Sequence, residues 1–359
     1  MKIVPVVLAG GVGERFWPLS RSFRPKQLLP LIGRRSMLEE TLERVSPFCK
    51  GAVRPLIVAS RAIAAPIRRL LRGKYACDVI AEPVGRNTAP AILMAALWIR
   101  QRHGPGAVMA VLPADHAVSP ASAFAATLRI AAAIAARQGL LVIFGITPSR
   151  PDTGYGYILR GKRIAGVKHG FAVVRFVEKP GLASARRYAA SNAYYWNSGM
   201  FVWTAGTIIA EFAAHMPGLH RLGRAAEKAG FSQKAIDAYY RAAKPESVDY
   251  GIMEHSRRAA VLPAAFSWDD VGSWDSVGRL RPRTALGTAV SGGRVFEREC
   301  RDSIIVNDSP LHVAAVGLDN IVLVATGDAV LAISREKLPD IKKYRREMQK
   351  TAGFSPRLF

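Results

Sequence analysis

A glycine-rich segment flanked by basic residues follows the first apolar stretch of the chain. Residues 10–13 are Gly-Gly-Val-Gly, and Arg15, Arg21 and Lys26 come soon after. Glycines allow backbone N–H groups to approach phosphate oxygens, and the basic side chains can add charge-assisted hydrogen bonds. The segment is not a P-loop, because it lacks GxxxxGK[ST], and Phe16 stands where the dinucleotide motif GxGxxG requires a glycine. It therefore predicts a phosphate cradle of another type, with a simple tight turn as the alternative.

An acidic residue follows a second apolar run, in the segment Leu-Pro-Ala-Asp-His at 112–116. Open α/β sheets bind ligands beyond the carboxyl ends of their strands, so Asp115 is a candidate metal ligand there. The alternative is that Asp115 caps the following turn. For His116 we expect simple packing, because no second histidine or cysteine lies at a metal-binding spacing.

The segment 268–274, Trp-Asp-Asp-Val-Gly-Ser-Trp, is a candidate source of a second carboxylate. Successive strand residues point to opposite faces, so only one of Asp269 and Asp270 should reach the site. Nucleophilic catalysis has no support, because no GxSxG motif is present and the cysteines have no neighbouring histidine. Metal-assisted transfer to a phosphorus centre fits better, since there the protein mainly positions the reactants and neutralises charge.

Alternating strands and helices must position these residues. Apolar runs predict buried strands, and their alternation with helical segments predicts a mostly parallel sheet covered on both faces. Ser36 and Glu39 have the spacing of a capping box, and Thr88 can cap a helix that has Pro90 in its first turn. The expected fold class is therefore α/β. Strands are predicted at 3–9, 56–59, 79–81, 108–112 and 140–146, and helices at 36–45, 88–102 and 121–136.

The regular alternation of predicted strands and helices ends in the second half of the chain. Strands near 157–159, 172–177 and 200–203 extend the same sheet and add a second ligand pocket, and helical segments fill about 205–256. From about Thr284, short strands separated by Asn, Asp and Gly predict a small β-domain or β-roll that ends in a charged helix. We therefore predict a catalytic domain over residues 1–283 and a C-terminal β-domain over 284–359.

The composition is that of a globular protein of two or three domains, with 359 residues, 50% of them hydrophobic and 22% charged. The three cysteines form no CxxC or zinc pattern, which fits a reducing compartment best. No apolar run reaches the length of a membrane span, and the apolar N-terminal run is interpreted as a strand rather than a signal peptide.

The formal net charge of +24 raises the question of a polyanionic partner. A nucleic-acid binder should gather its basic residues into a stripe or tail with aromatics between them, whereas here arginines are dispersed from Arg15 to Arg357. Nucleic-acid binding is therefore not expected. An arginine-rich and alanine-rich composition is also what a GC-biased genome produces.

Further segments complete an ordered series with the glycine-rich and acidic segments. They are Glu-Pro-Val-Gly-Arg-Asn-Thr-Ala-Pro at 82–90, Thr-Gly-Tyr-Gly-Tyr-Ile at 153–158, Phe-Val-Glu-Lys-Pro at 176–180, Trp-Asn-Ser-Gly-Met-Phe at 196–201 and Val-Asp-Tyr at 248–250. From about residue 4 to 275, the series resembles the sugar-phosphate nucleotidyltransferases, and among them the members that transfer guanylyl to mannose 1-phosphate. One departure is Phe16, where leucine is usual, and it puts no catalytic role in doubt.

This resemblance implies a Rossmann-like nucleotidyltransferase domain followed by a small C-terminal β-helical domain, which often serves dimerisation. It further implies a cytoplasmic homodimer that joins GTP and α-D-mannose 1-phosphate to give GDP-mannose and pyrophosphate, with Mg²⁺ or another divalent cation. Longer members carry a cupin-like phosphomannose isomerase domain. Because this chain stops at Phe359, we expect the monofunctional form.

The resemblance also assigns roles to individual residues. Arg15, Lys26, Asp115 and Asp270 are the implied catalytic residues, and the two aspartates are the implied metal ligands. The implied nucleotide-binding residues are Gly10, Gly11, Gly13, Arg15, Lys26, Glu82, Arg86, Asn87, Thr88 and Asp115. The implied residues for the sugar and its phosphate are Gly156, Glu178, Lys179 and Asn197.

Two other interpretations stay open from the sequence. Thymidylyl or uridylyl transfer to glucose 1-phosphate is the nearest enzymatic alternative. A non-catalytic regulatory relative that binds nucleotide is the other, but such relatives typically lose the loop Arg and Lys or the metal-binding acids, which this chain keeps.

Overall fold

The computed structural model describes residues 1–11, 13–167 and 169–359, so Val12 of the glycine-rich segment lies outside the described residues. The chain divides into two compact units, and the glycine-rich loop from Gly11, together with Asp115 and Asp270, belongs to the second. The boundary at 283/284 stays a prediction about where the catalytic domain ends. The first unit comprises Met1–Gly10, Thr41–Ala114 and Val118–Trp268, and the second comprises Gly11–Glu40, Asp115–Ala117 and Asp269–Phe359.

The first unit is built on a nine-stranded mixed sheet with the strand order β3-β2-β1-β4-β9-β6-β10-β8-β7. The pairs among β3, β2, β1 and β4 are parallel, as is β6 with β10, and the remaining pairs are antiparallel. The α/β class is confirmed. The antiparallel share exceeds the sequence prediction because β9 returns between β4 and β6, and because β8 pairs antiparallel with both β10 and β7. The strands are β1 (Ile3–Ala9), β2 (Leu56–Ser60), β3 (Asp78–Glu82), β4 (Val108–Pro113), β6 (Leu141–Ile146), β7 (Tyr157–Arg163), β8 (Phe171–Val177), β9 (Tyr194–Thr204) and β10 (Ala259–Pro263).

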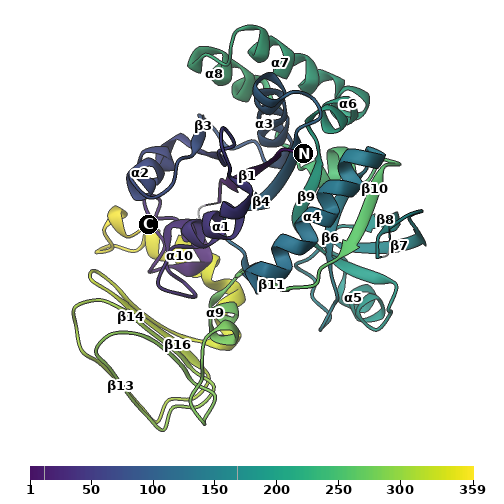
Figure 1. The fold of residues 1–359 in the computed structure, drawn as a ribbon. Coiled ribbons are helices and arrows are strands. Elements are labelled where there is room, and N and C mark those ends of the chain that lie inside the picture. Colours follow the sequence, from purple (N-terminus) through teal and green to yellow (C-terminus); the bar gives the residue numbers. More distant parts are fainter. Residues whose placement is uncertain (12, 168) are drawn as a thin grey trace. The chain divides into compact units, whose positions relative to one another are not determined.

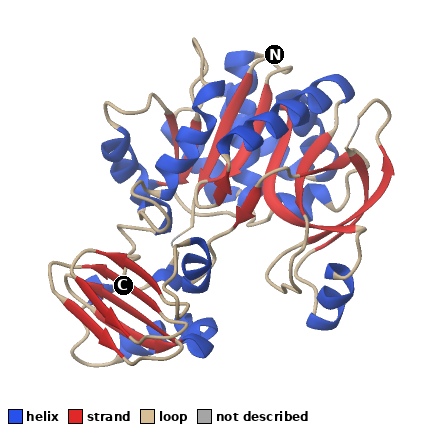
Figure 2. Ribbon diagram, turned by 60° about the horizontal axis from the view of Figure 1, so that its bottom comes forward, coloured by secondary structure: helices blue, strands red, loops and turns tan. Residues whose placement is uncertain are grey.

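Helices cover both faces of this sheet (Figure 1, Figure 2). Helix α3 lies in the core on one face, and every residue from Ala89 to Ile99 is buried. Helix α4 packs on the other face through Phe124 and Leu128. The helices of this unit are α2 (Arg61–Leu71), α3 (Thr88–His103), α4 (Ala121–Gln138), α5 (Leu182–Ala189), α6 (Ala205–His215), α7 (Pro217–Lys228), α8 (Gln233–Ala242) and the short η4 (Asp249–Met253).

Two helix starts test the predicted caps. Helix α1 (Met37–Val45) begins after Ser36, whose hydroxyl accepts from the Glu39 N–H while the Glu39 carboxylate accepts from the Ser36 N–H, so the capping box is confirmed. The predicted cap of α3 is wrong by one residue. Asn87 is the N-cap, its side-chain oxygen accepts from the Thr88 N–H at 2.8 Å, and Thr88 is the first helical residue. Asparagine is a stronger cap than threonine and tolerates the positive φ found here, +66°.

The second unit contains stacked strands in two sheets, with the orders β12-β14-β16-β17 and β13-β15 (Figure 1). The pairs β12 with β14, β14 with β16 and β13 with β15 are parallel, which agrees with the β-helical domain implied by the resemblance. Only β17 closes the stack antiparallel. Its elements are β12 (Ala289–Gly292), β13 (Val295–Arg298), β14 (Ile304–Asp308), β15 (Val313–Val316), β16 (Ile321–Thr326), β17 (Val330–Ser334), α9 (Trp274–Leu280), η5 (Arg335–Asp340), α10 (Ile341–Lys350) and η6 (Pro356–Leu358).

An apolar core joins the N-terminal loop of the second unit to its C-terminal strands. Phe16 and Leu29 pack with Trp274 of α9 and Ile304 of β14, and the rings of Phe16 and Trp274 meet edge to face at 5.2 Å. The loop carries the short helices η1 (Glu14–Phe16) and η2 (Lys26–Leu28), and η3 (Ser46–Phe48) follows α1 in the first unit. The short strands β5 (Ala117–Ser119) and β11 (Ser267–Asp269) mark where the chain passes between units. Among the described residues, no helix is long and apolar enough to cross a bilayer.

Candidate functional site

The glycine-rich loop of the second unit is built around Lys26. Gly13 has a left-handed backbone with φ +71°, and a Cβ added to it would lie 2.3 Å from the Cβ of Lys26. Only glycine therefore allows the loop to pass this closely over the lysine. The Ser20 hydroxyl donates to the carbonyl of Gly13 at 2.8 Å and holds the turn, whereas Gly11 faces open space.

Lys26 joins the two acidic segments that the sequence singled out. Its side chain is buried, and its Nζ donates to Asp115 Oδ2 and to the backbone carbonyl of Asp270, both at 2.7 Å. Burial acts to raise the pKa of the Asp115 carboxyl, but the charge of Lys26 and its hydrogen bond, with help from His116, hold that pKa below its usual value. Asp115 is thus kept ionised beside a buried cation. Arg15 is exposed, and its guanidinium contacts only the Gly272 carbonyl, at 3.4 Å, among the described residues.

The two neighbouring aspartates have different environments. The carboxylate of Asp269 is buried and accepts from Arg279 and from the Val271 N–H, each at 2.8 Å. The Asp269 carboxylate therefore stabilises the turn that precedes α9. Asp270 accepts from the Gly272 N–H through Oδ1 at 3.1 Å, and its own carbonyl contacts Lys26.

The chemistry of this donor set fits a magnesium ion. Within the described part of the chain, no group of three or more His, Cys, Asp or Glu side chains could hold a metal. Mg²⁺ does not need such a cage, because it is commonly held by one or two carboxylates and completes its shell with water and substrate phosphates. Lys26 contacts the Asp115 carboxylate and the Asp270 backbone carbonyl, so the two residues lie near one another and could supply two carboxylates to such an ion.

In the first unit, Glu82 ends β3 as a buried carboxyl without an ion-pair partner among the described residues. Burial raises the pKa of Glu82 to about 7. Gly10 lies close to it, since a Cβ on Gly10 would be 3.7 Å from Glu82 Oε2. A carboxyl that titrates near neutrality at the end of a parallel strand is a candidate ligand-binding group.

The residues that follow Glu82 are tied to the helical part of the first unit. Arg86 donates to the carbonyls of Tyr240 and Arg241 at the end of α8, at 2.9 and 3.2 Å. Thr88 accepts from the Val248 N–H through its hydroxyl at 2.9 Å. The side chains of Arg86, Asn87 and Thr88 therefore hold the shape of this segment.

Four predicted sugar-site residues lie together in the first unit. A Cβ on Gly156 would lie 2.6 Å from Glu178 Oε2 and 3.4 Å from the Cβ of Asn197, so glycine lets both side chains approach. The Asn197 N–H donates to the Gly156 carbonyl at 2.8 Å. Lys179 has a positive φ of +43°, and its Nζ donates to Glu178 Oε1 at 2.5 Å.

Asp249 joins this cluster and was not among the predicted site residues. Asn197 Nδ2 donates to Asp249 Oδ1 at 2.9 Å. Burial, and then the negative charge of Glu178, raise the pKa of Asp249 to about 6, while the hydrogen bond from Asn197 acts in the opposite direction. The Val-Asp-Tyr segment was noticed in the sequence, but a single acid before a helical turn carries no signal of its own.

The structure thus collects the candidates into three groups. Gly13, Arg15, Lys26, Asp115 and Asp270 form one group in the second unit, and Gly11 belongs to the same loop. In the first unit, Gly10 and Glu82 lie together, and residues 86–88, for which nucleotide binding stays a prediction, follow Glu82 in the chain. The third group is Gly156, Glu178, Lys179 and Asn197, with Asp249 added.

A buried lysine that joins the carboxylate of Asp115 to the backbone carbonyl of Asp270 under a glycine-rich loop, in a chain with a mixed α/β sheet and a β-helical tail, is typical of a protein that handles nucleoside phosphates. The chain belongs to the nucleotidyl transferase family, whose sequence model matches residues 4–284. The resemblance seen in the sequence is therefore confirmed.

Several characterised proteins are similar over nearly the whole chain. A mannose-1-phosphate guanylyltransferase of Escherichia coli is 40% identical over 351 residues, which cover 95% of this chain and 73% of the relative. The xanthan biosynthesis protein XanB of Xanthomonas campestris pv. campestris is 41% identical, covering 98% of this chain and 74% of the relative. The crystal structure of mannose-1-phosphate geranyltransferase from Thermus thermophilus superposes with a TM-score of 0.85 at 32% identity, covering 97% of this chain and all of that one.

Proposed function

We propose that this protein is a mannose-1-phosphate guanylyltransferase, which transfers GMP from GTP to α-D-mannose 1-phosphate and releases pyrophosphate. The observation that carries the proposal is the contact of the buried Lys26 with Asp115 and Asp270 beneath the loop at Gly13. The names of relatives that are about 40% identical over 95% of the chain supply the substrate pair.

In the proposed reaction, an oxygen of the sugar phosphate attacks the α-phosphorus of GTP in line, and pyrophosphate leaves. The attacking phosphate is already ionised near neutral pH, so the chain needs no general base and acts mainly by positioning and charge. Arg15 is exposed and lightly held, which leaves its guanidinium available to the triphosphate. Lys26 is fixed in place, so it offsets negative charge without reorganising during the reaction.

The glycine-rich loop would hold the phosphates through backbone N–H groups, which the open space at Gly11 allows. Asp115 and Asp270 would hold Mg²⁺. When bound, the ion would neutralise charge on the phosphates during transfer. The depressed pKa of Asp115 keeps this carboxylate ready for a cation across the neutral pH range.

The guanine base is assigned to the end of β3. The N1–H and N2–H₂ groups of guanine are paired donors that suit a carboxylate or carbonyl acceptor. Glu82 is the candidate acceptor, because it is buried, lies at Gly10 and has no cation bound to it among the described residues. A donor pair from guanine would favour its ionised form.

The sugar is assigned to the cluster at Glu178. A carboxylate accepts from neighbouring hydroxyls, an amide both donates and accepts, and a lysine can bind the phosphate. Glu178 and Asn197 supply the first two groups, and the exposed Lys179 supplies the third. Asp249 orients the Asn197 amide, which fixes its oxygen and nitrogen for the sugar. An unpaired partner in the wrong epimer costs roughly 1–3 kcal/mol, so the axial 2-hydroxyl of mannose can set the preference over glucose.

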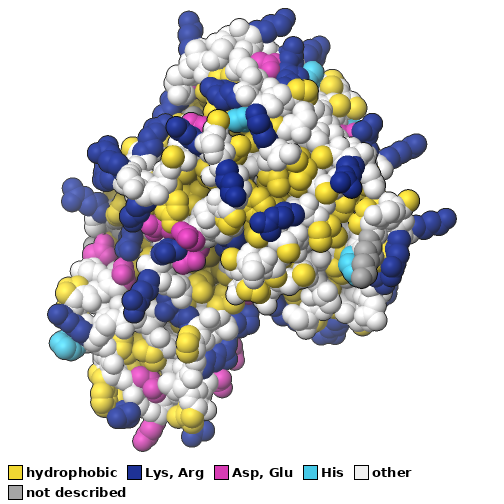
Figure 3. Space-filling model, viewed as in Figure 1, with side chains coloured by type: hydrophobic (Ala, Val, Ile, Leu, Met, Phe, Trp, Pro, Cys, Tyr) yellow, Lys and Arg dark blue, Asp and Glu magenta, His cyan; other side chains and the backbone are white. Residues whose placement is uncertain are grey.

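We further propose a cytoplasmic homodimer. The strands of the β-helical domain expose apolar side chains, among them Phe296 and Val316, as a subunit interface would require. Basic side chains are scattered over the visible face in Figure 3 rather than gathered in a stripe, so a nucleic-acid partner is not proposed.

One assay separates this proposal from its alternatives. Pyrophosphate release is measured for ATP, GTP, UTP and dTTP, each with mannose 1-phosphate, glucose 1-phosphate and galactose 1-phosphate. We expect GTP with mannose 1-phosphate to give the highest kcat/KM. Preference for UTP or dTTP with glucose 1-phosphate would support the pyrimidine-specific alternative. GTP binding without turnover of any pair would support a non-catalytic regulatory protein.

A further inference from the structure

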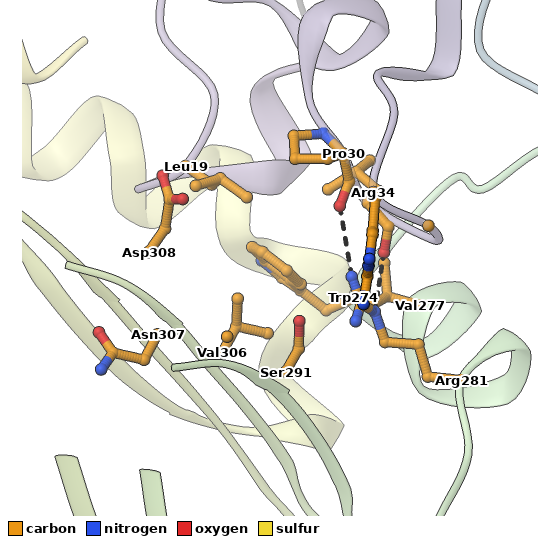
Figure 4. A pocket seen from close by; sticks show the side chains of 13 residues that line it. Leu19, Pro30, Arg34, Trp274, Val277, Arg281, Ser291, Val306, Asn307 and Asp308 are labelled. Carbon is orange, nitrogen blue, oxygen red and sulfur yellow. Dashed lines mark hydrogen bonds between the residues drawn. The ribbon is translucent and has the colours of Figure 1, made fainter. Parts of the chain in front are cut away.

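The second unit contains a cavity of about 550 Å³ that none of the proposed reaction steps uses (Figure 4). This volume lies within the usual range for sites that bind small molecules. Three parts of the unit surround it: the loop that contains Lys26, the helix α9 with the residue that follows it, and the strands β12 and β14. Its walls include Leu19, Arg34, Trp274, Arg281, Ser291 and Asp308.

One side of the cavity is cationic. Arg34 and Arg281 both lie on this side in Figure 4. Arg281 is fixed, because its Nε donates to the Leu31 carbonyl at 2.9 Å and its Nη2 to the Pro30 carbonyl at 3.3 Å. Arg34 makes no hydrogen bond or ion pair with any residue that the structure describes. No acidic side chain contacts either arginine among those described.

The opposite side offers acceptors for hydroxyl groups. Asp308 lies there with Asn307, across from the arginines in Figure 4. Asp308 Oδ2 accepts from Arg24 at 2.9 Å, which orients the carboxylate and leaves Oδ1 without a described partner. The Asn307 amide donates to the carbonyls of Gly293 and Leu311 and accepts from the Ser309 N–H. The Ser291 hydroxyl, which lies between the two sides, has no described partner.

The space between the two sides is too poor in exposed aromatic surface for a nucleobase. A base is normally held against the face of an aromatic ring. Trp274 is the aromatic residue of the lining, and it is only 1% exposed because it packs against Phe16. An anion with a hydroxylated body matches the lining better than an anion with a flat ring.

From this arrangement we propose a second ligand site, separate from the reaction site, that binds a sugar phosphate. The phosphate would contact the guanidinium groups of Arg34 and Arg281, which match phosphate oxygens in a forked geometry. The sugar hydroxyls would donate to Asp308 and exchange hydrogen bonds with Ser291.

The site is regulatory, because residues that line it lie only a few positions along the chain from the proposed catalytic residues or are hydrogen-bonded to their segments. Arg281 binds the carbonyls of Pro30 and Leu31, four and five residues after Lys26 in the chain. Trp274 follows Asp270 by four residues. A ligand whose phosphate contacts Arg281 therefore acts, through these two hydrogen bonds, on the loop that carries Lys26, and occupancy changes turnover.

Direct binding tests the site without relying on the proposed reaction. The probe is mannose 6-phosphate, titrated by calorimetry into the full chain carrying Lys179→Ala, which weakens the sugar cluster of the first unit. We expect one molecule bound per chain. Adding Arg34→Ala should weaken binding by about ten- to a hundredfold, the usual cost of a charged hydrogen bond. Ser291→Phe should abolish binding by filling the cavity.

Matched controls decide the outcome. Arg346→Ala removes an exposed arginine of the same unit that does not line the cavity, and it should leave the affinity unchanged. Inorganic phosphate should bind more weakly than mannose 6-phosphate, since it lacks the hydroxyls that face Asp308. Undiminished affinity in the Arg34→Ala variant, or equal affinity for phosphate alone, would overturn the proposal. Arg34 is exposed and makes no described contact, so this variant remains informative even if Ser291→Phe does not fold.

Turnover supplies the second readout. Pyrophosphate release from GTP and mannose 1-phosphate should change in the presence of mannose 6-phosphate in the otherwise unmodified chain, and this response should be lost in Arg34→Ala. A response that persists in Arg34→Ala would contradict the site. Normal turnover without probe binding would refute this inference alone, whereas probe binding without any turnover would refute the proposed function alone.

Discussion

Replacing Gly13 by alanine tests whether the glycine-rich loop positions Lys26. The new methyl group would lie 2.3 Å from Lys26 Cβ and 3.0 Å from its backbone nitrogen, where ordinary contact begins near 3.4 Å. The lysine or the loop must therefore move by about 1 Å. Because the nearest atoms belong to the start of the side chain and to the backbone, a rotation at the far end of Lys26 cannot relieve the contact.

Two costs of the Gly13→Ala change can be worked out. A left-handed backbone at alanine costs roughly 1–2 kcal/mol, and forcing atoms into a packed region costs roughly 1–3 kcal/mol. We therefore expect a loss of about 2–5 kcal/mol in the free energy of unfolding. Displacement of a catalytic group by 1 Å can cost about a hundredfold in rate, so kcat/KM should fall by at least that factor.

Urea unfolding and pyrophosphate release measure the two effects. Gly11→Ala is the matched control for stability, because it lies in the same loop, has no atom within 4 Å of the added Cβ and has no positive φ. Its free energy of unfolding should stay close to that of the unmodified protein. If Gly13→Ala were as stable as Gly11→Ala and kept its kcat/KM, the close approach of the loop to Lys26 would be refuted.

Three other predictions concern the remaining groups. Asp115→Asn and Asp270→Asn should each abolish turnover while the protein stays folded by circular dichroism, and turnover without any divalent cation would contradict their role. Glu82→Gln should remove a pH dependence of stability: the folded protein holds the Glu82 proton up to about pH 7, so this group's stabilisation is complete below its unfolded pKa near 4.5 and is lost as the pH rises through 7. The stabilisation lost over this pH range is about 3 kcal/mol. If the unfolding free energy changed equally between pH 5 and pH 8 in the unmodified protein and in Glu82→Gln, this prediction would be refuted. Lys179→Ala and Asn197→Ala should raise the KM for mannose 1-phosphate by about tenfold or more and leave that for GTP unchanged, whereas the reverse pattern would place them in the nucleotide site.

The positions of the strands along the chain were easier to predict from the sequence than their order in the sheet. Buried parallel strands read as continuous apolar runs, and their ends are marked by glycine, proline or an acid, as at Gly10 and Pro113. The insertion of β9 between β4 and β6 could not be predicted in this way. Strand order depends on contacts between segments far apart in the chain, and the apolar pattern of 194–204 is the same in any position.

The roles of side chains were harder to predict where the same type of residue can either bind a ligand or stabilise the fold. Nucleotide binding by Arg86 stays a prediction, and the structure adds that its guanidinium binds the carbonyls of Tyr240 and Arg241 in α8. The sequence cannot show this use, because α8 lies about 150 residues further along the chain. Asp249 was missed for the same reason, since its significance comes from Asn197, which is distant in sequence.

The meeting of Lys26 with Asp115 follows from the register of two strands. β1 and β4 are neighbouring parallel strands with Leu8 opposite Pro113, so the segments that begin at Gly11 and Asp115 leave the same edge of the sheet at the same level. Lys26 and Asp115 are 89 residues apart in sequence, but Asp115 follows the end of β4 by two residues and Lys26 lies in the loop that follows β1. Val4 and Val6 of β1 pack in the core on one face of the sheet and Ile3 in the core on the other, so a slip of this register by one residue would exchange these side chains between two different cores.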